Sequence, residues 1–575
     1  MLKLYRYLKP YWAMITGVLV LVFLQTLADL YLPTLMSDII NDGVMMGDIP
    51  FIYKTGGFML LIAGGGVVAS IIASYWSSKA STALGRDIRS KVFKRVESFS
   101  LHEFDKIGTA TLITRTTNDI TQVQTVTMLV MRMMVSAPLM MIGALILALQ
   151  KDVPLTGVLF VAIPVLVAMI IFIAFKIIPL FRKVQIKIDR INLVLREKLT
   201  GIRVIRAFNT SAHETERFEE ANEDLTENYI KINKIMAFMM PAIMLIMNLT
   251  SLAVLWFGII RINDGSMDVG ALIAFTQYAM QIMFSILMLS MMFIMVPRAQ
   301  AAATRINEVL ATEPGIVDKD DTKSCFIGKG NVEFKDVTFS YFGAEEPALK
   351  NITFTARAGE MTAIIGSTGA GKSTLVNLIP RFYDIDSGEI LVDGVNVNEM
   401  TQECLREKIG FVPQKAMLFS GTISENIRVG KEDATDEEIK YAAQIAQATE
   451  FIDEMEEKFE HEIAQGGTNV SGGQKQRLAI ARALVRRPEI YVFDDSFSAL
   501  DFKTDSKLRA ALKNEIAEAT VIIVAQRVGT VMEADQIIVL DEGKVNGIGT
   551  HKELMQTCEV YREIVSSQLS EEELA

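Results

Sequence analysis

The chain has 575 residues, half of them hydrophobic, with a mean hydropathy of +0.30 and a formal net charge of −11. This length exceeds one ordinary domain, this hydropathy excludes a wholly soluble protein, and the lack of a basic tract interleaved with aromatics excludes nucleic acid as an expected partner. The three cysteines, Cys325, Cys404 and Cys558, match neither a disulfide framework nor a zinc site in their spacing, so reduced thiols are expected.

The apolar residues are concentrated in the first half of the chain. Long uninterrupted apolar runs there give way to the mixed composition of a soluble α/β domain. We therefore expect a transmembrane domain over residues 1–310, a linker over residues 311–330 and a soluble domain over residues 331–575.

Six apolar segments are long enough to span a bilayer, since crossing about 30 Å of hydrocarbon takes roughly 20 apolar residues. They are residues 12–36, 56–78, 125–149, 154–180, 234–261 and 269–296. The basic, amphipathic residues 1–11 are expected to form an interfacial helix before the first span. The long connections, residues 79–124 and 181–233, are rich in Lys and Arg, whereas the short loops carry acidic residues. By the positive-inside rule both termini and both long connections are cytoplasmic, which predicts a multi-pass protein of the cytoplasmic membrane.

The two long connections show helical periodicity, so the membrane helices are expected to continue into the cytoplasm. Each connection is interrupted, once around residues 101–111 and once around residues 209–219. A short turn at either place could dock on another domain, which makes both segments candidate coupling elements.

Several polar side chains lie within the predicted spans. They are Gln25, Asp29, Arg132, Asn248, Gln277 and Gln281. Ionisable groups inside a bilayer are costly and usually face a bundle interior or a water-filled cavity, so this set is a candidate substrate path, with Asp29 and Arg132 foremost. Hydrogen bonding between helices is an equally open interpretation. Methionine runs at residues 236–247 and 280–295 would suit an adaptable apolar cavity, or simply fill apolar positions.

In the soluble half, the apolar residues 362–365 predict a short strand, which a glycine-rich loop and a helical run follow. This is the phosphate-loop pattern in its strand–loop–helix context. The loop residues are Gly366, Ser367, Thr368, Gly369, Ala370, Gly371, Lys372, Ser373 and Thr374. Glycines let backbone amides close on phosphates, Lys372 can reach the β and γ phosphates, and the Ser373 hydroxyl can ligate Mg²⁺. The sequence therefore predicts a site for ATP and Mg²⁺.

A second buried strand is predicted over residues 490–493, and it ends in Asp494. A carboxylate at the end of such a strand can hold the metal, directly or through water. An aspartate after an apolar strand is common by itself. Together with the phosphate loop, it strengthens the prediction of a nucleotide site.

Between these strands lies Val470-Ser471-Gly472-Gly473-Gln474-Lys475-Gln476-Arg477, which resembles the signature of ATP-binding cassette (ABC) proteins. The order of motifs along the whole chain resembles one half of an ABC exporter of the multidrug type. The resemblance implies six transmembrane helices followed by an α/β P-loop nucleotide-binding domain. It also implies roles for Tyr341 as an aromatic that stacks on adenine, Gln414 as the Q-loop glutamine near the metal, Asp501 in the D-loop and Gln526 at the switch position.

The same resemblance implies that the signature residues Ser471, Gly472, Gly473 and Gln474 close on ATP held by the opposite subunit. The chemistry is sound, because glycine amides and a serine hydroxyl at a helix N-terminus form an anion site. A half-transporter must therefore dimerise to work.

Two residues of the nucleotide site depart from the family pattern. Asp495 stands where the catalytic glutamate is expected, and its carboxylate is withdrawn by one C–C bond, roughly 1.5 Å. A displacement on the order of 1 Å can cost about a hundredfold in rate. Gln526 stands where the family has histidine, and its amide cannot carry a proton as imidazole can. The site is thus expected to bind ATP and to hydrolyse it poorly.

An intact signature beside a degenerate site predicts a heterodimer. The expected partner is a second half-exporter that carries the Glu and the His and has an altered signature. The expected activity is ATP-driven efflux of amphipathic small molecules or drugs across the cytoplasmic membrane, with membrane lipid as a further expected partner. Two alternatives stay open: a slow homodimeric exporter of lipid or peptide, and an ATP-gated, channel-like member of the superfamily. A soluble cassette ATPase is excluded by the six spans.

Overall fold

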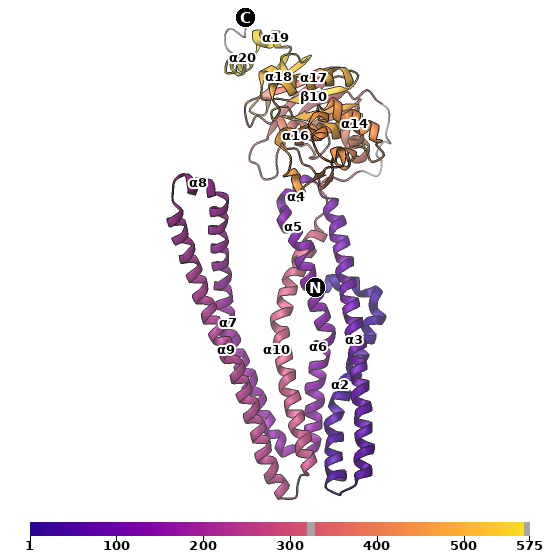
Figure 1. The fold of residues 1–575 in the computed structure, drawn as a ribbon, viewed down its shortest axis with the longest axis vertical. Coiled ribbons are helices and arrows are strands. Elements are labelled where there is room, and N and C mark those ends of the chain that lie inside the picture. The colour runs from indigo at the N-terminus through magenta and orange to yellow at the C-terminus, as the bar shows by residue number, and fades with distance from the viewer. Residues whose placement is uncertain (319–327, 569–575) are drawn as a thin grey trace. The chain divides into compact units, whose positions relative to one another are not determined.

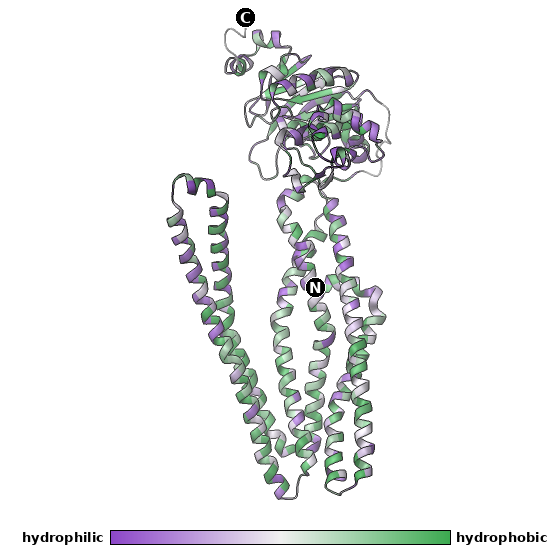
Figure 2. Cartoon of the chain, viewed as in Figure 1, coloured by the Kyte–Doolittle hydropathy of each residue, from purple (hydrophilic) through white to green (hydrophobic). Residues whose placement is uncertain are grey.

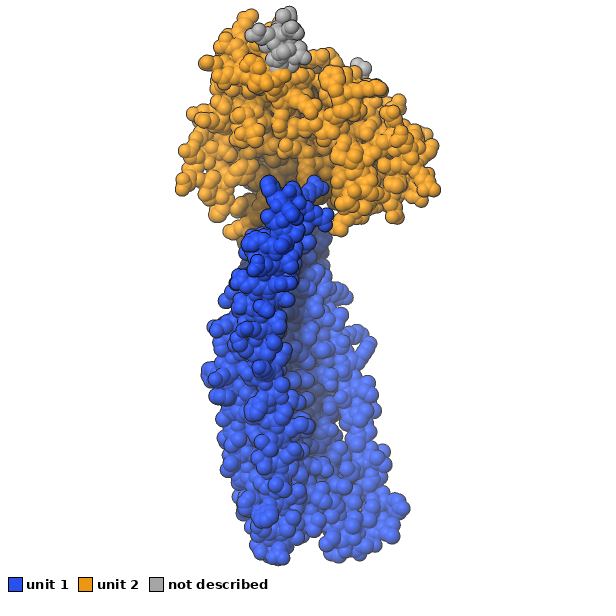
Figure 3. Space-filling model, turned by 60° about the vertical axis from the view of Figure 1, so that its left-hand side comes forward, with its two compact units in different colours: residues 1–97, 109–312 blue, residues 98–108, 313–575 orange. Residues whose placement is uncertain are grey.

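The computed structural model describes residues 1–318 and 328–568. The chain forms two compact units (Figures 1 and 3). Unit 1 comprises residues 1–97 and 109–312, and unit 2 comprises residues 98–108 together with the described residues from 313 onward.

Unit 1 is built from long helices. Its elements are α1 (Leu2–Tyr5), η1 (Arg6–Tyr11), α2 (Trp12–Asp38), η2 (Ile39–Val44), α3 (Ile49–Glu97), α5 (Thr109–Thr116), α6 (Asn118–Lys151), α7 (Val153–Thr200), α8 (Ile202–Ala207), α9 (Ser211–Asn263) and α10 (Val269–Ala311). Six helical stretches are long and apolar enough to cross a membrane, and each contains one predicted span. The predicted six-helix membrane domain is confirmed. Hydrophobic residues predominate along these long helices (Figure 2).

The membrane helices continue far beyond the predicted spans, as the periodicity of the connections indicated. Helix α9 has 53 residues, and at 1.5 Å per residue it is about 80 Å long, against roughly 30 Å of hydrocarbon. The break in the second long connection differs from the prediction. The short helix there is α8, residues 208–210 form the break, and α9 already begins at Ser211, so most of the predicted interruption is helical.

Polar groups fix the ends of several helices in unit 1. The Asp152 carboxylate accepts the backbone N–H of Leu155 at 2.7 Å, which caps α7. It also accepts Arg261 Nε at 2.8 Å, which ties the start of α7 to the end of α9. Near the other end of the bundle, Arg305 of α10 donates to Asp119 of α6 through both Nε and Nη2, and this bidentate geometry holds α10 against α6.

Unit 2 contains three sheets. The strands are β1 (Val332–Phe339), β2 (Leu349–Ala356), β3 (Met361–Gly366), β4 (Ser387–Val392), β5 (Val395–Asn396), β6 (Ile409–Val412), β7 (Gly421–Thr422), β8 (Glu462–Ile463), β9 (Ile490–Asp494), β10 (Thr520–Val524), β11 (Gln536–Asp541) and β12 (Lys544–Gly549). The six-stranded sheet has the order β12-β11-β3-β10-β9-β6 and is parallel except for β12. The antiparallel sheet has the order β2-β1-β4-β5, and β7 pairs with β8.

Helices accompany these strands and complete the predicted α/β domain. They are α4 (Leu101–Ile107), α11 (Lys372–Leu378), η3 (Val397–Glu399), α12 (Gln402–Glu407), α13 (Ile423–Arg428), α14 (Asp436–Ile445), α15 (Thr449–Asp453), η4 (Lys458–Glu460), η5 (Gln465–Gly467), α16 (Gly472–Leu484), α17 (Phe502–Glu515), α18 (Val528–Val531), α19 (His551–Thr557) and α20 (Glu559–Ser566). The central parallel strands are fully buried, as β9 and β10 illustrate, because helices cover both faces of such a sheet.

Helix α4 comes from the first long connection but belongs to unit 2. The Ser100 N–H and hydroxyl both donate to the buried Glu103 carboxylate, which closes a capping box at its start. The His102 ring lies 4.9 Å from the Phe342 ring, and Lys106 Nζ lies 5.5 Å from the same ring. One of the two candidate coupling segments therefore packs beside Tyr341.

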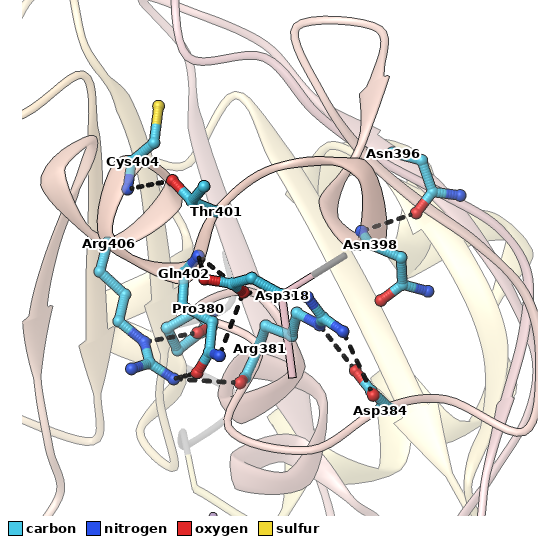
Figure 4. Close-up of polar contacts among 10 residues, drawn as sticks. All are labelled: Asp318, Pro380, Arg381, Asp384, Asn396, Asn398, Thr401, Gln402, Cys404 and Arg406. Carbon is cyan, nitrogen blue, oxygen red and sulfur yellow. Dashed lines mark hydrogen bonds and ion pairs between the residues drawn. The ribbon is translucent and has the colours of Figure 1, made fainter. Parts of the chain in front are cut away.

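Asp318 anchors the segment that enters unit 2 (Figure 4). Its carboxylate accepts the backbone N–H of Gln402 at 3.2 Å and the Gln402 side-chain amide at 3.1 Å. In the neighbouring helix α12, Cys404 is disulfide-bonded, which corrects the expectation of a reduced thiol there. Cys558 is free and buried, and Cys325 lies outside the described residues.

Candidate functional site

The phosphate loop connects the end of β3 to the start of α11. A Cβ atom at Gly366 would lie 2.1 Å from the Leu540 backbone oxygen on the neighbouring strand, so only glycine fits there. Gly371 has a φ of +95°, in the left-handed region that favours glycine. Residues 367–369 between them are exposed, as a loop that closes on a phosphate requires.

The parallel register brings the other site residues to the same edge of the sheet. Val524 of β10 is level with both Ile364 of β3 and Asp494 of β9. Gly366, Asp494 and the residues after β10 therefore meet at the carboxyl ends of three adjacent strands, where open α/β sheets bind ligands.

Lys372 is held inside the loop. Its Nζ donates to the Gly366 oxygen at 2.8 Å and to the Ser367 oxygen at 2.7 Å. Burial lowers the pKa of the ammonium group, and the nearby charges of Asp495 and Asp494 oppose that change. An incoming phosphate would add a further compensating negative charge at this position.

Ser373 and Asp494 form the oxygen pair expected for a metal. The Ser373 hydroxyl donates to Asp494 Oδ1 at 2.9 Å. The described residues contain no cluster of three or more His, Cys, Asp or Glu side chains that could hold a metal alone. A hydroxyl with one carboxylate suits Mg²⁺, which keeps several waters and takes other ligands from substrate phosphates. These residues therefore fit a magnesium ion that arrives with a nucleotide.

Replacing Asp494 with asparagine should stabilise the nucleotide-free protein near neutral pH. Burial raises the pKa of the Asp494 carboxyl, so ionising it as the pH rises lowers the free energy of unfolding. Asn removes this loss and keeps an oxygen for Ser373. We expect the thermal midpoint of the variant at pH 7 to rise by about 2–4 °C for each ~1 kcal/mol added to the free energy of unfolding. This added stability should shrink as the pH falls through the raised pKa of Asp494.

The matched control is Asp501→Asn. Hydrogen bonds from Thr504 lower the pKa of the Asp501 carboxyl, so its stabilising contribution is present at neutral pH and is lost on acidification. This variant should lower the midpoint at pH 7. Equal shifts of the same sign for the two variants would contradict this account of Asp494.

Asp495 is the centre of a small amide network. Its Oδ2 accepts Gln526 Nε2 at 2.7 Å and Gln414 Nε2 at 3.3 Å. The amide nitrogens face it because a carboxylate only accepts hydrogen bonds. Asp495 itself is buried, with a φ of +46°, and its N–H donates to the Val524 oxygen at 3.0 Å. The structure thus brings together the two residues that depart from the family pattern and the Q-loop glutamine.

Tyr341 lies next to the phosphate loop. Its hydroxyl is 3.0 Å from the Thr374 hydroxyl, and its ring packs edge-on against Tyr383 at 5.6 Å. Burial, with smaller contributions from Tyr341 and Asp105, raises the pKa of Tyr383 to about 12. The half-exposed Tyr341 ring is available to stack on a flat ligand.

The signature begins helix α16. Ser471 is the exposed N-cap, its hydroxyl accepts the Gln474 N–H at 3.3 Å, and its own N–H donates to Gln474 Oε1 at 2.8 Å. Gly472 is exposed with open space where a Cβ would stand, whereas a Cβ at Gly473 would lie 3.3 Å from the Ala499 oxygen. The glycine amides at this helix end are therefore open to an anion. Asp501 caps α17 by accepting the Thr504 N–H at 3.0 Å.

The candidate substrate-path residues divide into separate groups. Gln25 and Asp29 share a hydrogen bond on α2, and Gln281 of α10 donates to the Asp29 backbone oxygen at 3.0 Å. Arg132 of α6 donates to Ser74 of α3 at 3.0 Å. Asn248 and Gln277 are exposed. Within the described residues, the Arg132 side chain joins α6 to α3, whereas the Asp29 side chain bonds within α2 and only the Asp29 backbone oxygen accepts a bond from another helix. The substrate path stays a prediction.

One residue at the switch was missed by sequence reasoning. Gln568, after α20, donates through Nε2 to the Gln526 backbone oxygen at 2.8 Å and accepts the Val528 N–H at 2.8 Å. It holds the backbone on both sides of Arg527. A glutamine near a chain terminus carries no pattern that marks such a role.

Comparisons with known proteins cover nearly the whole chain. Residues 15–287 match the ABC transporter transmembrane region, and residues 349–498 match the ABC transporter family. An uncharacterized ABC transporter ATP-binding protein of Mycobacterium tuberculosis (strain CDC 1551 / Oshkosh) is 42% identical over 98% of this chain and 97% of its own. The ATP-dependent lipid A-core flippase of Haemophilus influenzae (strain 86-028NP) is 31% identical over 99% of this chain and 97% of its own.

A solved structure shares the fold. The structure of a bacterial Atm1-family ABC exporter with ATP bound superposes with a TM-score of 0.80, over 97% of this chain and 98% of that one. The two sequences are 24% identical, so this likeness concerns the fold alone.

Proposed function

The chain belongs to the ABC transporter family as an exporter half-transporter with a cytoplasmic ATP-binding domain, and from this premise we propose that it is the degenerate subunit of a heterodimeric efflux transporter. Its own site holds Mg·ATP and hydrolyses it poorly. Its signature residues complete the competent site of a partner chain that carries Glu and His at the positions of Asp495 and Gln526.

The amide network on Asp495 is the observation that carries this proposal. A general base must reach the water and have a lone pair free to accept its proton. Here the short carboxylate is buried, and one of its oxygens already accepts two amide N–H groups. Lys372, Ser373 and Asp494 keep the arrangement that binds Mg·ATP. The short carboxylate and its engaged Oδ2 support ATP binding with inefficient water activation.

The signature supports the second half of the proposal. Ser471 is exposed at the start of α16, and Gly472 leaves its amide uncovered. In the proposed dimer this anion site binds the phosphate of the ATP held by the partner subunit, and not that of the ATP bound to its own chain. In a homodimer both sites would pair a competent signature with a weak base, which leaves transport without a fast power stroke.

Export of amphipathic small molecules is the proposed transport activity. The six apolar helices with a few polar residues offer a path for such compounds, with Gln25, Asp29, Gln281 and Arg132 as the polar positions. Similarity to a lipid A-core flippase favours an amphipathic lipid as the second candidate cargo.

The isolated chain should bind Mg·ATP and hydrolyse it very slowly. Binding is measured by titration with a fluorescent ATP analogue in Mg²⁺, and hydrolysis by phosphate release from the same preparation. Lys372→Ala is the control that should lose binding. Vigorous hydrolysis by the purified chain without a partner would overturn the proposal, because a degenerate site cannot supply it.

A further inference from the structure

A groove runs between α7 and α9 in unit 1. It has a volume of about 650 Å³ and is lined along α7 by residues 154–165 and along α9 by residues 246–264. The two helices lie side by side (Figure 1), and most of the residues that line the groove are apolar. Small residues, Gly157, Ala162 and Ala253, make the hollow. A volume of this size is in the range of ligand sites.

The two walls of the groove differ in length. The α7 wall covers 12 residues, a rise of about 16.5 Å and close to the ~15 Å of one leaflet, whereas the wall along residues 246–264 rises about 27 Å. Its end at Pro154 and Asp264 lies at the start of α7 and the end of α9. Because the ATP-binding domain is cytoplasmic and follows the sixth helix, these helix ends lie at the opposite, outer surface of the membrane.

Two opposite charges stand at this outer end. The guanidinium of Arg261 lines the groove, and its Nε is turned by the bond to the buried Asp152 carboxylate at 2.8 Å. Asp264, three residues further along the chain, also lines it and is exposed. The remaining guanidinium nitrogens present the planar donors that suit a phosphate, and the Asp264 carboxylate suits an ammonium group.

We propose that this groove is a binding site for one outer-leaflet zwitterionic phospholipid with a primary amine headgroup. One acyl chain lies along the apolar walls, the phosphate contacts Arg261, and the ammonium group contacts Asp264. The lipid is a fixed structural ligand and not the cargo, so its binding is independent of the nucleotide site and goes beyond the proposed function.

Native mass spectrometry of the full chain, released from nanodiscs into mild detergent, tests the site by counting the lipids that each protein retains. Nanodiscs of phosphatidylethanolamine and of phosphatidylglycerol are compared. The wild type should retain one phosphatidylethanolamine and less phosphatidylglycerol. Gly157→Leu should reduce this retention by about tenfold, because the leucine fills the groove, and leucine is also a better helix former than glycine. Nothing lies within 4 Å of a Cβ at position 157, so the variant should fold.

Arg261→Gln should reduce retention as well, and Lys151→Gln is its matched control. Lys151 lies at the same membrane surface, at the end of α6, but does not line the groove. Retention should be unchanged in this control.

Three results would overturn the inference. Equal retention in wild type and Gly157→Leu would place the retained lipid elsewhere, and equal retention of phosphatidylglycerol would refute the headgroup assignment. The third concerns Ala253→Cys and a phosphatidylethanolamine that carries a maleimide on an acyl chain and keeps its free amine. If the thiol crosslinks to a second polypeptide and not to this lipid, the groove is a protein interface. None of these measurements uses ATP hydrolysis, so their failure is distinct from a failure of the proposed function.

Discussion

Replacing Ser471 with arginine should lower the ATPase rate of the assembled heterodimer by about 10²–10³-fold, the cost of losing a preorganised donor to developing charge. Ser471 is the exposed cap of α16, and the amides behind it are the anion site offered to the partner's ATP. An arginine side chain there both removes the cap and blocks approach of the phosphate. Steady-state phosphate release by the purified complex measures the effect.

Thr550→Arg is the matched control for this substitution. Thr550 caps α19 with the same reciprocal pattern, through Glu553, so the variant loses an equivalent capping box, worth ~1 kcal/mol, away from the signature. Its ATPase rate should stay close to that of the wild type. Asp495→Gln should also cost far less than neutralising the partner's catalytic glutamate. If Ser471→Arg were harmless, or if Asp495→Gln abolished turnover, the division of labour between the subunits would be wrong.

Asp495→Glu combined with Gln526→His should raise hydrolysis by the isolated chain about a hundredfold. The glutamate extends the carboxylate by roughly 1.5 Å, toward the position of the water. The histidine replaces an amide that donates to Asp495 at 2.7 Å with a ring that can carry a proton. Phosphate release is measured at saturating Mg·ATP, so that the comparison concerns the chemical step.

Each single variant separates the two contributions, and the double variant with Lys372→Ala should be inactive. Asp495 has a φ of +46°, a conformation that aspartate adopts more readily than most residues, so the glutamate variant is checked for ATP affinity first. A double variant that binds Mg·ATP as the wild type does, yet hydrolyses it no faster, would show that the Asp495 network is not what limits this site.

Periodicity and motif order predicted the six spans, the long helices and the α/β domain, because these depend on local patterns of apolar residues and glycines. The order of motifs along the chain also indicated the residues of the nucleotide site. The sequence could not predict that Gln414 and Gln526 share one oxygen of Asp495, since amide orientation depends on side chains far apart along the chain. The contacts of Gln568 with the backbone of Gln526 and Val528 could not be predicted for the same reason.

Other differences have equally physical causes. Residues 211–219 have a helical pattern and belong to α9, so the break lies N-terminal to most of the predicted interruption, directly after α8. Spacing alone indicated reduced cysteines, but a disulfide depends on which chain segments meet in the fold, and Cys404 is bonded. The sequence located the polar residues within the spans but could not identify their hydrogen-bond partners. The structure supplies those partners, such as Ser74 for Arg132.

The membership of α4 in unit 2 has a consequence for how the chain is made. Its contacts with Phe342 join segments that are more than ~200 residues apart along the sequence. At 5–20 residues per second, ribosomes take about 10–50 s to synthesise that interval. Throughout this time α4 has been translated but its docking surface has not. The nucleotide-binding unit thus cannot finish folding until four further membrane helices have been synthesised, which couples its maturation to their insertion.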